Sequence, residues 1–74
     1  MNKGKTVKIS GPVIDVEFPE GKLPKIKEAL KIQTEDGEKT AEVAEHVGNR
    51  TVRAIMLSGS EGLARGNEVV ADGK

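Results

Sequence analysis

The chain has 74 residues, with 12 basic and 12 acidic side chains, no cysteine and a single aromatic residue, Phe18. This composition excludes disulfides and thiolate metal sites, and the balanced charge argues against long-range attraction to nucleic acid or anionic lipid. Because no apolar run approaches the roughly 20 residues of a membrane span and no apolar segment follows the basic N-terminus, we expect a soluble, cytoplasmic protein without direct membrane insertion.

Nine glycines divide the chain into short segments with the composition and alternation of β-strands. The strands are predicted over residues 5–10, 13–18, 30–34, 39–47, 51–57 and 68–71. In the first of these, Val7 and Ile9 fall on one face. The second follows a Gly11-Pro12 break, and its apolar residues alternate with Asp15 and Glu17, as in a strand with one buried face.

Turn residues separate these predicted strands. The sequence PEGKLP forms a loop in which Gly21 can take a positive φ, and residues 24–30 could form one or two helical turns. Asp36-Gly37 is the strongest turn signal, because Asp-Gly is preferred in two-residue type I′ hairpins. Gly48 begins another tight turn with Asn49. Gly11, Pro12, Asp36, Gly37 and Gly48 are therefore the predicted turn residues.

Six short strands and little helix predict an all-β fold. Closing the sheet removes unpaired edges, which small β domains must otherwise protect. We therefore expect one domain over residues 1–74, a small closed six-stranded β-barrel with at most one short helical turn. Its predicted core is Val7, Ile9, Ile14, Val16, Phe18, Ile32, Val43, Val52 and Ala54.

The sequence offers few residues for catalysis or metal binding. His46 is the sole histidine, which excludes a two-histidine metal site, and a surface or hydrogen-bonding role is expected for it. The serines lack a neighbouring base, and the carboxylates of Asp15 and Glu17 fit a solvated strand face. We predict no catalytic, cofactor-binding or metal-binding residue.

Two further motifs have features of binding sites. The segment GSEGLARG is rich in glycine, but it lacks the phosphate-loop pattern and leads into a strand rather than a helix. Lys3, Lys5 and Lys8 cluster near the start, and GKTVKISGPV has a passing likeness to KOW-type RNA-binding barrels. The balanced charge and the single aromatic residue argue against nucleic-acid binding, so a KOW-like or OB-like nucleic-acid-binding barrel stays only as the alternative.

Four blocks in register carry a more specific resemblance. They are GKTVKISGPVIDVEF, LPKIKEAL, AEVAEHVGNRTVRAIML and SEGLARG. In this order and spacing they resemble the N-terminal barrel of the catalytic beta subunit of the F-type ATP synthase, whose strands typically read GPVVDV, EVAxHLG and TVRxIAM. The likeness covers about residues 4 to 73.

The resemblance implies a function in assembly. In that family six such barrels, alternating between alpha and beta subunits, form a collar that holds the hexamer together and lies within a peripheral membrane complex. The phosphate loop and the catalytic residues lie in later domains, so the resemblance implies a non-enzyme without cofactors. It also makes Gly11-Pro12 the corner between the first two strands, and neighbouring alpha-type barrels the partners. Arg53 and Arg65 match family positions, where each would make a subunit contact, an internal ion pair or neither.

Some residues depart from the family pattern. Val47 stands where a leucine is usual, Met56-Leu57 replaces an Ala-Met pair, and Ala64 replaces a larger residue. Together with the many lysines and glutamates, these departures point to an excised, reconstructed or redesigned domain. We expect the isolated chain to be a monomer.

Overall fold

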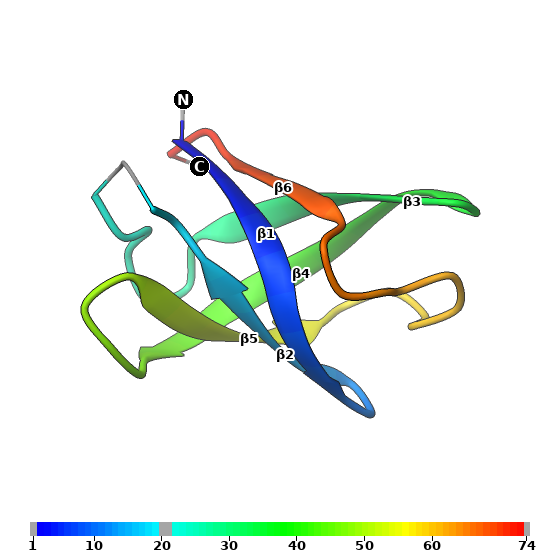
Figure 1. Cartoon of the computed structure of the whole chain (residues 1–74), viewed down its shortest axis with the longest axis horizontal. Helices are drawn as coiled ribbons and strands as arrows, with labels where there is room; N and C mark the ends of the chain where they lie inside the picture. The colour runs from blue at the N-terminus through cyan, green and yellow to red at the C-terminus, as the bar shows by residue number, and fades with distance from the viewer. Residues whose placement is uncertain (1, 20–21, 74) are drawn as a thin grey trace.

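The computed structural model describes residues 2–19 and 22–73, so Gly21 lies outside the described residues. Six antiparallel strands close into a barrel (Figure 1). They are β1 (Asn2–Ser10), β2 (Val13–Glu17), β3 (Ala29–Thr34), β4 (Gly37–His46), β5 (Thr51–Met56) and β6 (Glu68–Ala71). The described residues contain no helix, and thus none long and apolar enough to cross a membrane.

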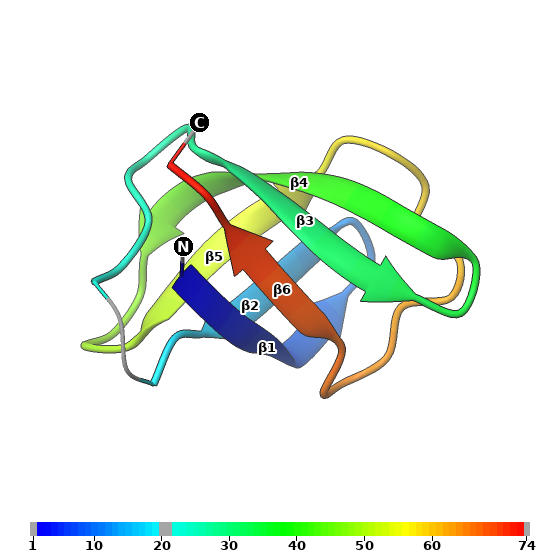
Figure 2. The same cartoon turned by 90° about the horizontal axis from the view of Figure 1, so that it is seen from above.

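The strands do not follow one another around the barrel in chain order. The closed order is β1-β2-β5-β4-β3-β6, and β6 pairs with β1 to complete the ring. In this cycle β1 and β4 occupy opposite positions, and the view from above shows them on opposite sides of the molecule (Figure 2). The six-stranded closed barrel expected from the sequence is confirmed.

Aliphatic side chains fill the interior of the barrel. Every strand after β1 contributes to the core, and Phe18 adds its ring just beyond the end of β2. The buried apolar residues are Ile14, Val16, Phe18, Leu30, Ile32, Ala41, Val43, Val52, Ala54, Met56, Val69 and Ala71. Because each strand places alternate side chains inward, most of the core predicted from alternation is confirmed.

Strand β1 corrects one of those core predictions. Val7 is 39% exposed, whereas Thr6 is fully buried. The register of β1 with β2 shifts between Thr6 and Lys8, which is a β-bulge. A bulge adds one residue to a strand and changes which side chains point inward, so Val7 faces outward while Ile9 packs partly against the core.

Two of the predicted turns also differ in the structure. Residues 24–30 form no helical turn; instead Glu28 N donates a hydrogen bond to Lys25 O at 3.0 Å, and Lys27 has a φ of 75°. This is the pattern of a type II turn, in which the third residue takes a positive φ. The prediction of helix was wrong because helical periodicity cannot be read from so short a segment.

In the β3–β4 hairpin the two-residue loop is Glu35-Asp36, since Thr34 pairs with Gly37. Gly37 has a φ of 103°, whereas neither loop residue has a positive φ. A type I′ turn needs positive φ at both loop residues, so that predicted type was wrong. Gly11, with a φ of 60°, does sit in the two-residue connection between Ser10 and Val13, followed by Pro12.

Candidate functional site

The outer surface of β2 and β5 carries a charged pair that links the two strands. Arg53 stands directly opposite Asp15 in the ladder. Its Nε donates to Asp15 Oδ1 at 3.0 Å and its Nη2 to Asp15 Oδ2 at 3.3 Å. This bidentate geometry joins a planar guanidinium to both oxygens of one carboxylate. The pair therefore links β2 to β5 on the outside of the barrel, in addition to the backbone ladder between them.

Neighbouring groups complete the surroundings of Arg53. The hydrogen bond to Asp15, followed by the charge of that carboxylate, raises the pKa of the Arg53 guanidinium. Glu45 on β4 approaches the same guanidinium at 3.9 Å, with 60% of its side chain exposed. A surface depression beside the pair is lined by Lys8, Ser10, Val13, Asp15 and Arg53. Arg53 thus belongs to a polar cluster that spans β2, β5 and β4.

The loop before β6 is fastened to β1 by one buried threonine. Thr6 Oγ1 donates to Ala64 O at 2.6 Å and accepts from Asn67 N at 3.0 Å. The backbone of Thr6 makes two more bonds, to Gly66 N and to Asn67 O. Asn67 Oδ1 in turn accepts from Ala64 N at 2.8 Å. This network gives the glycine-rich segment a definite conformation through contacts with β1.

Arg65 lies within that fastened loop, but its side chain is exposed. Among the described residues it forms no ion pair, in contrast to Arg53. The loop backbone on both sides of it is held by the Thr6 network. The structure therefore presents Arg65 outward on a loop whose backbone is held by hydrogen bonds to Thr6.

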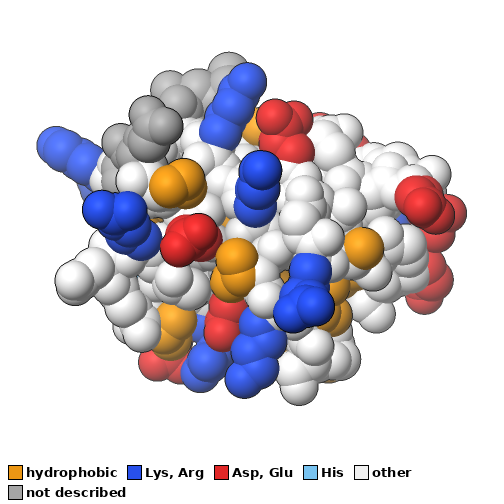
Figure 3. Space-filling view, in the orientation of Figure 1, with side chains coloured by type: hydrophobic (Ala, Val, Ile, Leu, Met, Phe, Trp, Pro, Cys, Tyr) orange, Lys and Arg blue, Asp and Glu red, His pale blue; other side chains and the backbone are white. Residues whose placement is uncertain are grey.

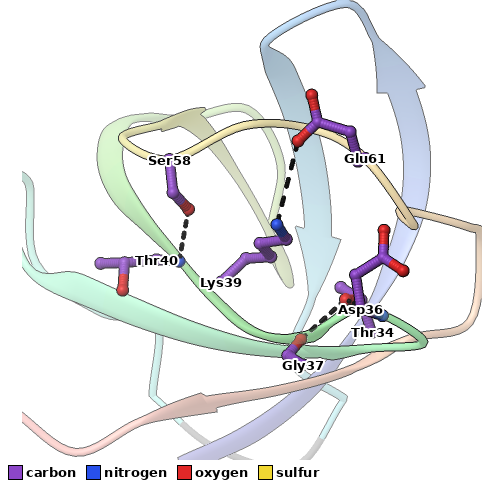
Figure 4. A network of polar contacts seen from close by, with 7 residues as sticks. All are labelled: Thr34, Asp36, Gly37, Lys39, Thr40, Ser58 and Glu61. Atoms are coloured by element: carbon purple, nitrogen blue, oxygen red, sulfur yellow. Dashed lines mark hydrogen bonds and ion pairs between the residues drawn. The ribbon is translucent and has the colours of Figure 1, made fainter.

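The first part of the same loop rests on the β3–β4 hairpin (Figure 4). Lys39 Nζ lies 3.9 Å from Glu61 Oε1, and Thr40 N donates to Ser58 Oγ at 3.3 Å. Within the hairpin, Thr34 Oγ1 donates to Gly37 O at 2.7 Å. These contacts come from backbone groups, hydroxyls and one ion pair, and they close this end of the barrel.

His46 also has a structural contact. Its Nε2 lies 2.7 Å from Pro24 O, so the ring ties the end of β4 to the segment before β3. Over residues 2–19 and 22–73 there is no cluster of histidine and carboxylate side chains that could hold a metal ion. The polar contacts described above thus join segments of the barrel to one another.

Comparison with known families agrees with this architecture. The model of the ATP synthase alpha/beta family, beta-barrel domain, matches residues 6–73. The chain belongs to this family. Proteins of the family form the ATP synthase alpha/beta hexamer, and the domain matched is the non-catalytic barrel. The family match covers three of the sequence blocks that carried the resemblance in full, and the first of them from Thr6 onward.

Several residues with structural roles in this ATP synthase barrel were missed in the sequence. Asp15 was expected on a solvated face, but it is 9% exposed and bound to Arg53. Thr6 and Asn67 belong to no motif in the sequence, although they organise the loop before β6. The partners of these residues lie 38 and 61 positions away in the chain, so only the register of the barrel could have revealed them.

Proposed function

We propose that this barrel is a non-catalytic assembly module of the beta type, which joins its subunit to neighbouring alpha-type barrels of an ATP synthase hexamer. The observation that carries the proposal is the family match over residues 6–73, for a domain of the alpha/beta hexamer. The structure supports it, because the barrel interior is filled with aliphatic side chains and the polar clusters join its own strands.

The beta-type assignment rests on the sequence blocks. GPVIDV, EVAEHVG and TVRAIML resemble the beta-subunit pattern in register. In the structure these segments form β2, the end of β4 and β5, which are consecutive in the closed order. The blocks thus describe one continuous side of the barrel rather than scattered positions.

Among the described residues, no structural feature favours the nucleic-acid alternative. Barrels that bind single strands stack bases on exposed aromatic rings, but the only aromatic residue, Phe18, is fully buried in the core. Lys5 stands between Glu17 and Glu68 in the ladder, so acidic groups flank the middle lysine of β1. We therefore do not propose this function.

A binding experiment with two partners tests the assembly proposal. Isolated alpha-type and beta-type barrel domains are titrated separately into the isotopically labelled chain, and binding is followed by NMR chemical shifts and by light scattering. We expect binding to the alpha-type barrel and weaker binding to the beta-type barrel. Equal binding to both would remove the beta-type assignment, and no binding to either at millimolar concentration would overturn the assembly function.

A further inference from the structure

The tip of the β3–β4 hairpin carries an aspartate that is followed by a glycine. Asp36 is the second residue of the two-residue loop, Gly37 begins β4, and both residues are exposed. The hairpin forms the right-hand end of the molecule in Figure 1, and Figure 3, in the same orientation, shows acidic side chains on the surface at that end. The peptide bond between Asp36 and Gly37 is therefore open to water.

The carboxylate of Asp36 has no polar partner among the described residues. It takes part in none of the hydrogen bonds and ion pairs formed there, and Figure 4 shows it without a contact. Its Oδ2 lies against the backbone of Gly62, where a Cβ built on that glycine would be only 3.0 Å away. Asp15 differs, because Arg53 binds both of its carboxylate oxygens. No hydrogen bond therefore keeps the side chain of Asp36 from rotating toward the next peptide nitrogen.

Glycine after the aspartate leaves that nitrogen unobstructed, because glycine has no Cβ. In such a sequence Gly37 N can attack Cγ of the protonated Asp36 carboxyl. A bond forms between N and Cγ, the bond from Cγ to its hydroxyl breaks, and the hydroxyl leaves with the amide proton as water, which yields a succinimide. Water then adds to either carbonyl of the ring: breaking the N–Cγ bond restores aspartate, whereas breaking the original peptide C–N bond gives isoaspartate.

We propose that Asp36–Gly37 is a site of spontaneous isomerisation to isoaspartate and that the hairpin sets its rate. Gly37 pairs with Thr34 at the end of the ladder, and in a β-turn the N–H of the fourth residue points to the carbonyl of the first. Thr34 Oγ1 also donates to Gly37 O at 2.7 Å and accepts from Asp36 N at 3.1 Å. Ring closure requires Gly37 N to leave this arrangement, so the reaction proceeds when the tip of the hairpin opens locally. This site is independent of the assembly function.

A second Asp-Gly sequence offers a comparison within the same chain. Asp72 is exposed and follows the end of β6. Gly73 N donates to Glu28 Oε2 at 3.0 Å, so a side chain from the segment before β3 holds this nitrogen. The third aspartate, Asp15, is 9% exposed and precedes Val16, whose branched side chain obstructs the attack. The two Asp-Gly sites are therefore held by different groups, which can be removed separately.

Isomerisation at the hairpin should also affect the loop before β6. Isoaspartate routes the backbone through the side chain and lengthens it by one carbon atom, so the two-residue loop no longer fits its closing ladder pair. Asp36 packs against Gly62, and Lys39 Nζ lies 3.9 Å from Glu61 Oε1 on the same loop. We expect the modified chain to lose these contacts and to exchange the amides of residues 58–62 faster.

Ageing of the folded chain, followed by peptide mapping, tests the inference. Isoaspartate is located by mass spectrometry with electron-transfer fragmentation and is quantified by methylation with a protein isoaspartate methyltransferase. The variants are Thr34→Val, which removes both hydroxyl contacts of the hairpin, and Glu28→Ala, which removes the acceptor for Gly73 N. The controls are Thr34→Ser, which keeps the hydroxyl, and Asp36→Glu, which keeps the charge but has a side chain too long to form the succinimide.

We expect isoaspartate to accumulate at Asp36 in the folded wild type, more slowly than in the same chain unfolded in urea. Thr34→Val should speed the reaction at Asp36 about fivefold, which corresponds to the loss of one net hydrogen bond, and should leave Asp72 unchanged. Glu28→Ala should speed the reaction at Asp72 and leave Asp36 unchanged. Thr34→Ser should age as the wild type does. In Asp36→Glu no isomerisation should occur at this position, and the amides of residues 58–62 should keep their initial exchange rates during ageing.

Several outcomes decide against the inference. Absence of isoaspartate at Asp36 in the folded chain, over a period in which the unfolded chain converts, overturns it. A Thr34→Val variant that speeds both sites equally also overturns it, because global unfolding would then set the rate. Thermal melts show whether each variant is folded; where Thr34→Val is not, the wild type is aged in urea below its unfolding transition, and an Asp36 rate that rises as steeply as the unfolding constant excludes local opening. Faster exchange of residues 58–62 in aged Asp36→Glu would show that the effect on the loop has another cause.

Discussion

Gly4 on β1 packs directly against the ring of Phe18. A Cβ built on Gly4 would lie 2.9 Å from Phe18 Cδ2 and would also collide with the carbonyl oxygen of Glu17. The second obstacle is backbone and cannot rotate away. The absence of a side chain at Gly4 is therefore what allows β1 to cross the end of β2 over the buried Phe18.

We expect Gly4→Ala to destabilise the barrel by about 1 to 3 kcal/mol, the usual cost of overpacking a filled core. The matched control is Gly48→Ala, because a Cβ there would meet only Thr51 Cβ at 3.9 Å. Urea unfolding followed by circular dichroism measures both. Equal stabilities for the two variants would show that β1 can move away from Phe18 at no cost.

Much of this fold could be predicted from sequence because each strand alternates and ends at a turn residue. The last strand, residues 68–71, was predicted with its observed bounds. The exceptions have physical reasons. A bulge at Thr6 to Lys8 changed which side of β1 is buried, and the turn at Lys27 depends on a positive φ that lysine rarely takes. The pairing of Arg53 with Asp15 follows from register alone.

From the observed register of β1 we predict how much two valines contribute to the stability of the barrel. Val16 is fully buried, whereas Val7 is 39% exposed. Val16→Ala should cost about 2 kcal/mol through lost burial and the cavity left behind, and Val7→Ala should change stability by about 0.5 kcal/mol or less. Thermal and urea unfolding of the two variants test this. A larger loss at Val7 would mean that β1 packs as simple alternation predicts.

The hydroxyl of Thr6 should contribute more to the stability of the barrel than the shape of the Thr6 side chain does. Thr6→Val keeps the shape but removes the donor to Ala64 O and the acceptor for Asn67 N. Both groups are only partly buried and would keep the long 3.4 Å hydrogen bond from Asn67 N to Ala64 O, so the loss of the hydroxyl should cost about 1 kcal/mol. We expect Thr6→Val to be destabilising and to speed amide exchange at Asn67, whereas Thr6→Ser should retain most of the stability. If Thr6→Val exchanged as slowly as wild type at Asn67, the hydroxyl would not hold the loop.

Lys27 offers a route to a more stable barrel. A φ of 75° destabilises the folded state by about 1 to 2 kcal/mol for a residue with a side chain. Glycine avoids this cost, but it increases the conformational entropy of the unfolded chain, which lowers the stability by about 0.5 to 1 kcal/mol. Lys27→Gly should therefore raise the melting temperature slightly. Lys25→Gly, in the same turn but without a positive φ, should lower it. A lower melting temperature for Lys27→Gly would show that its side chain has a stabilising contact.

The pair of Arg53 and Asp15 should show strong energetic coupling. A double-mutant cycle with Arg53→Gln and Asp15→Asn isolates the interaction from the effects of each change alone. We expect a larger coupling free energy than in the same cycle on Lys39 and Glu61, which are 3.9 Å apart with 74% of the Glu61 side chain exposed. The reason is geometry: two hydrogen bonds join Arg53 to a carboxylate on the adjacent strand, whereas exposed single contacts contribute little.

Arg53→Lys should lose much of the coupling, because a lysine cannot make both bonds in one plane. Equal coupling in the two cycles would show that the bidentate pair does not fix β2 against β5.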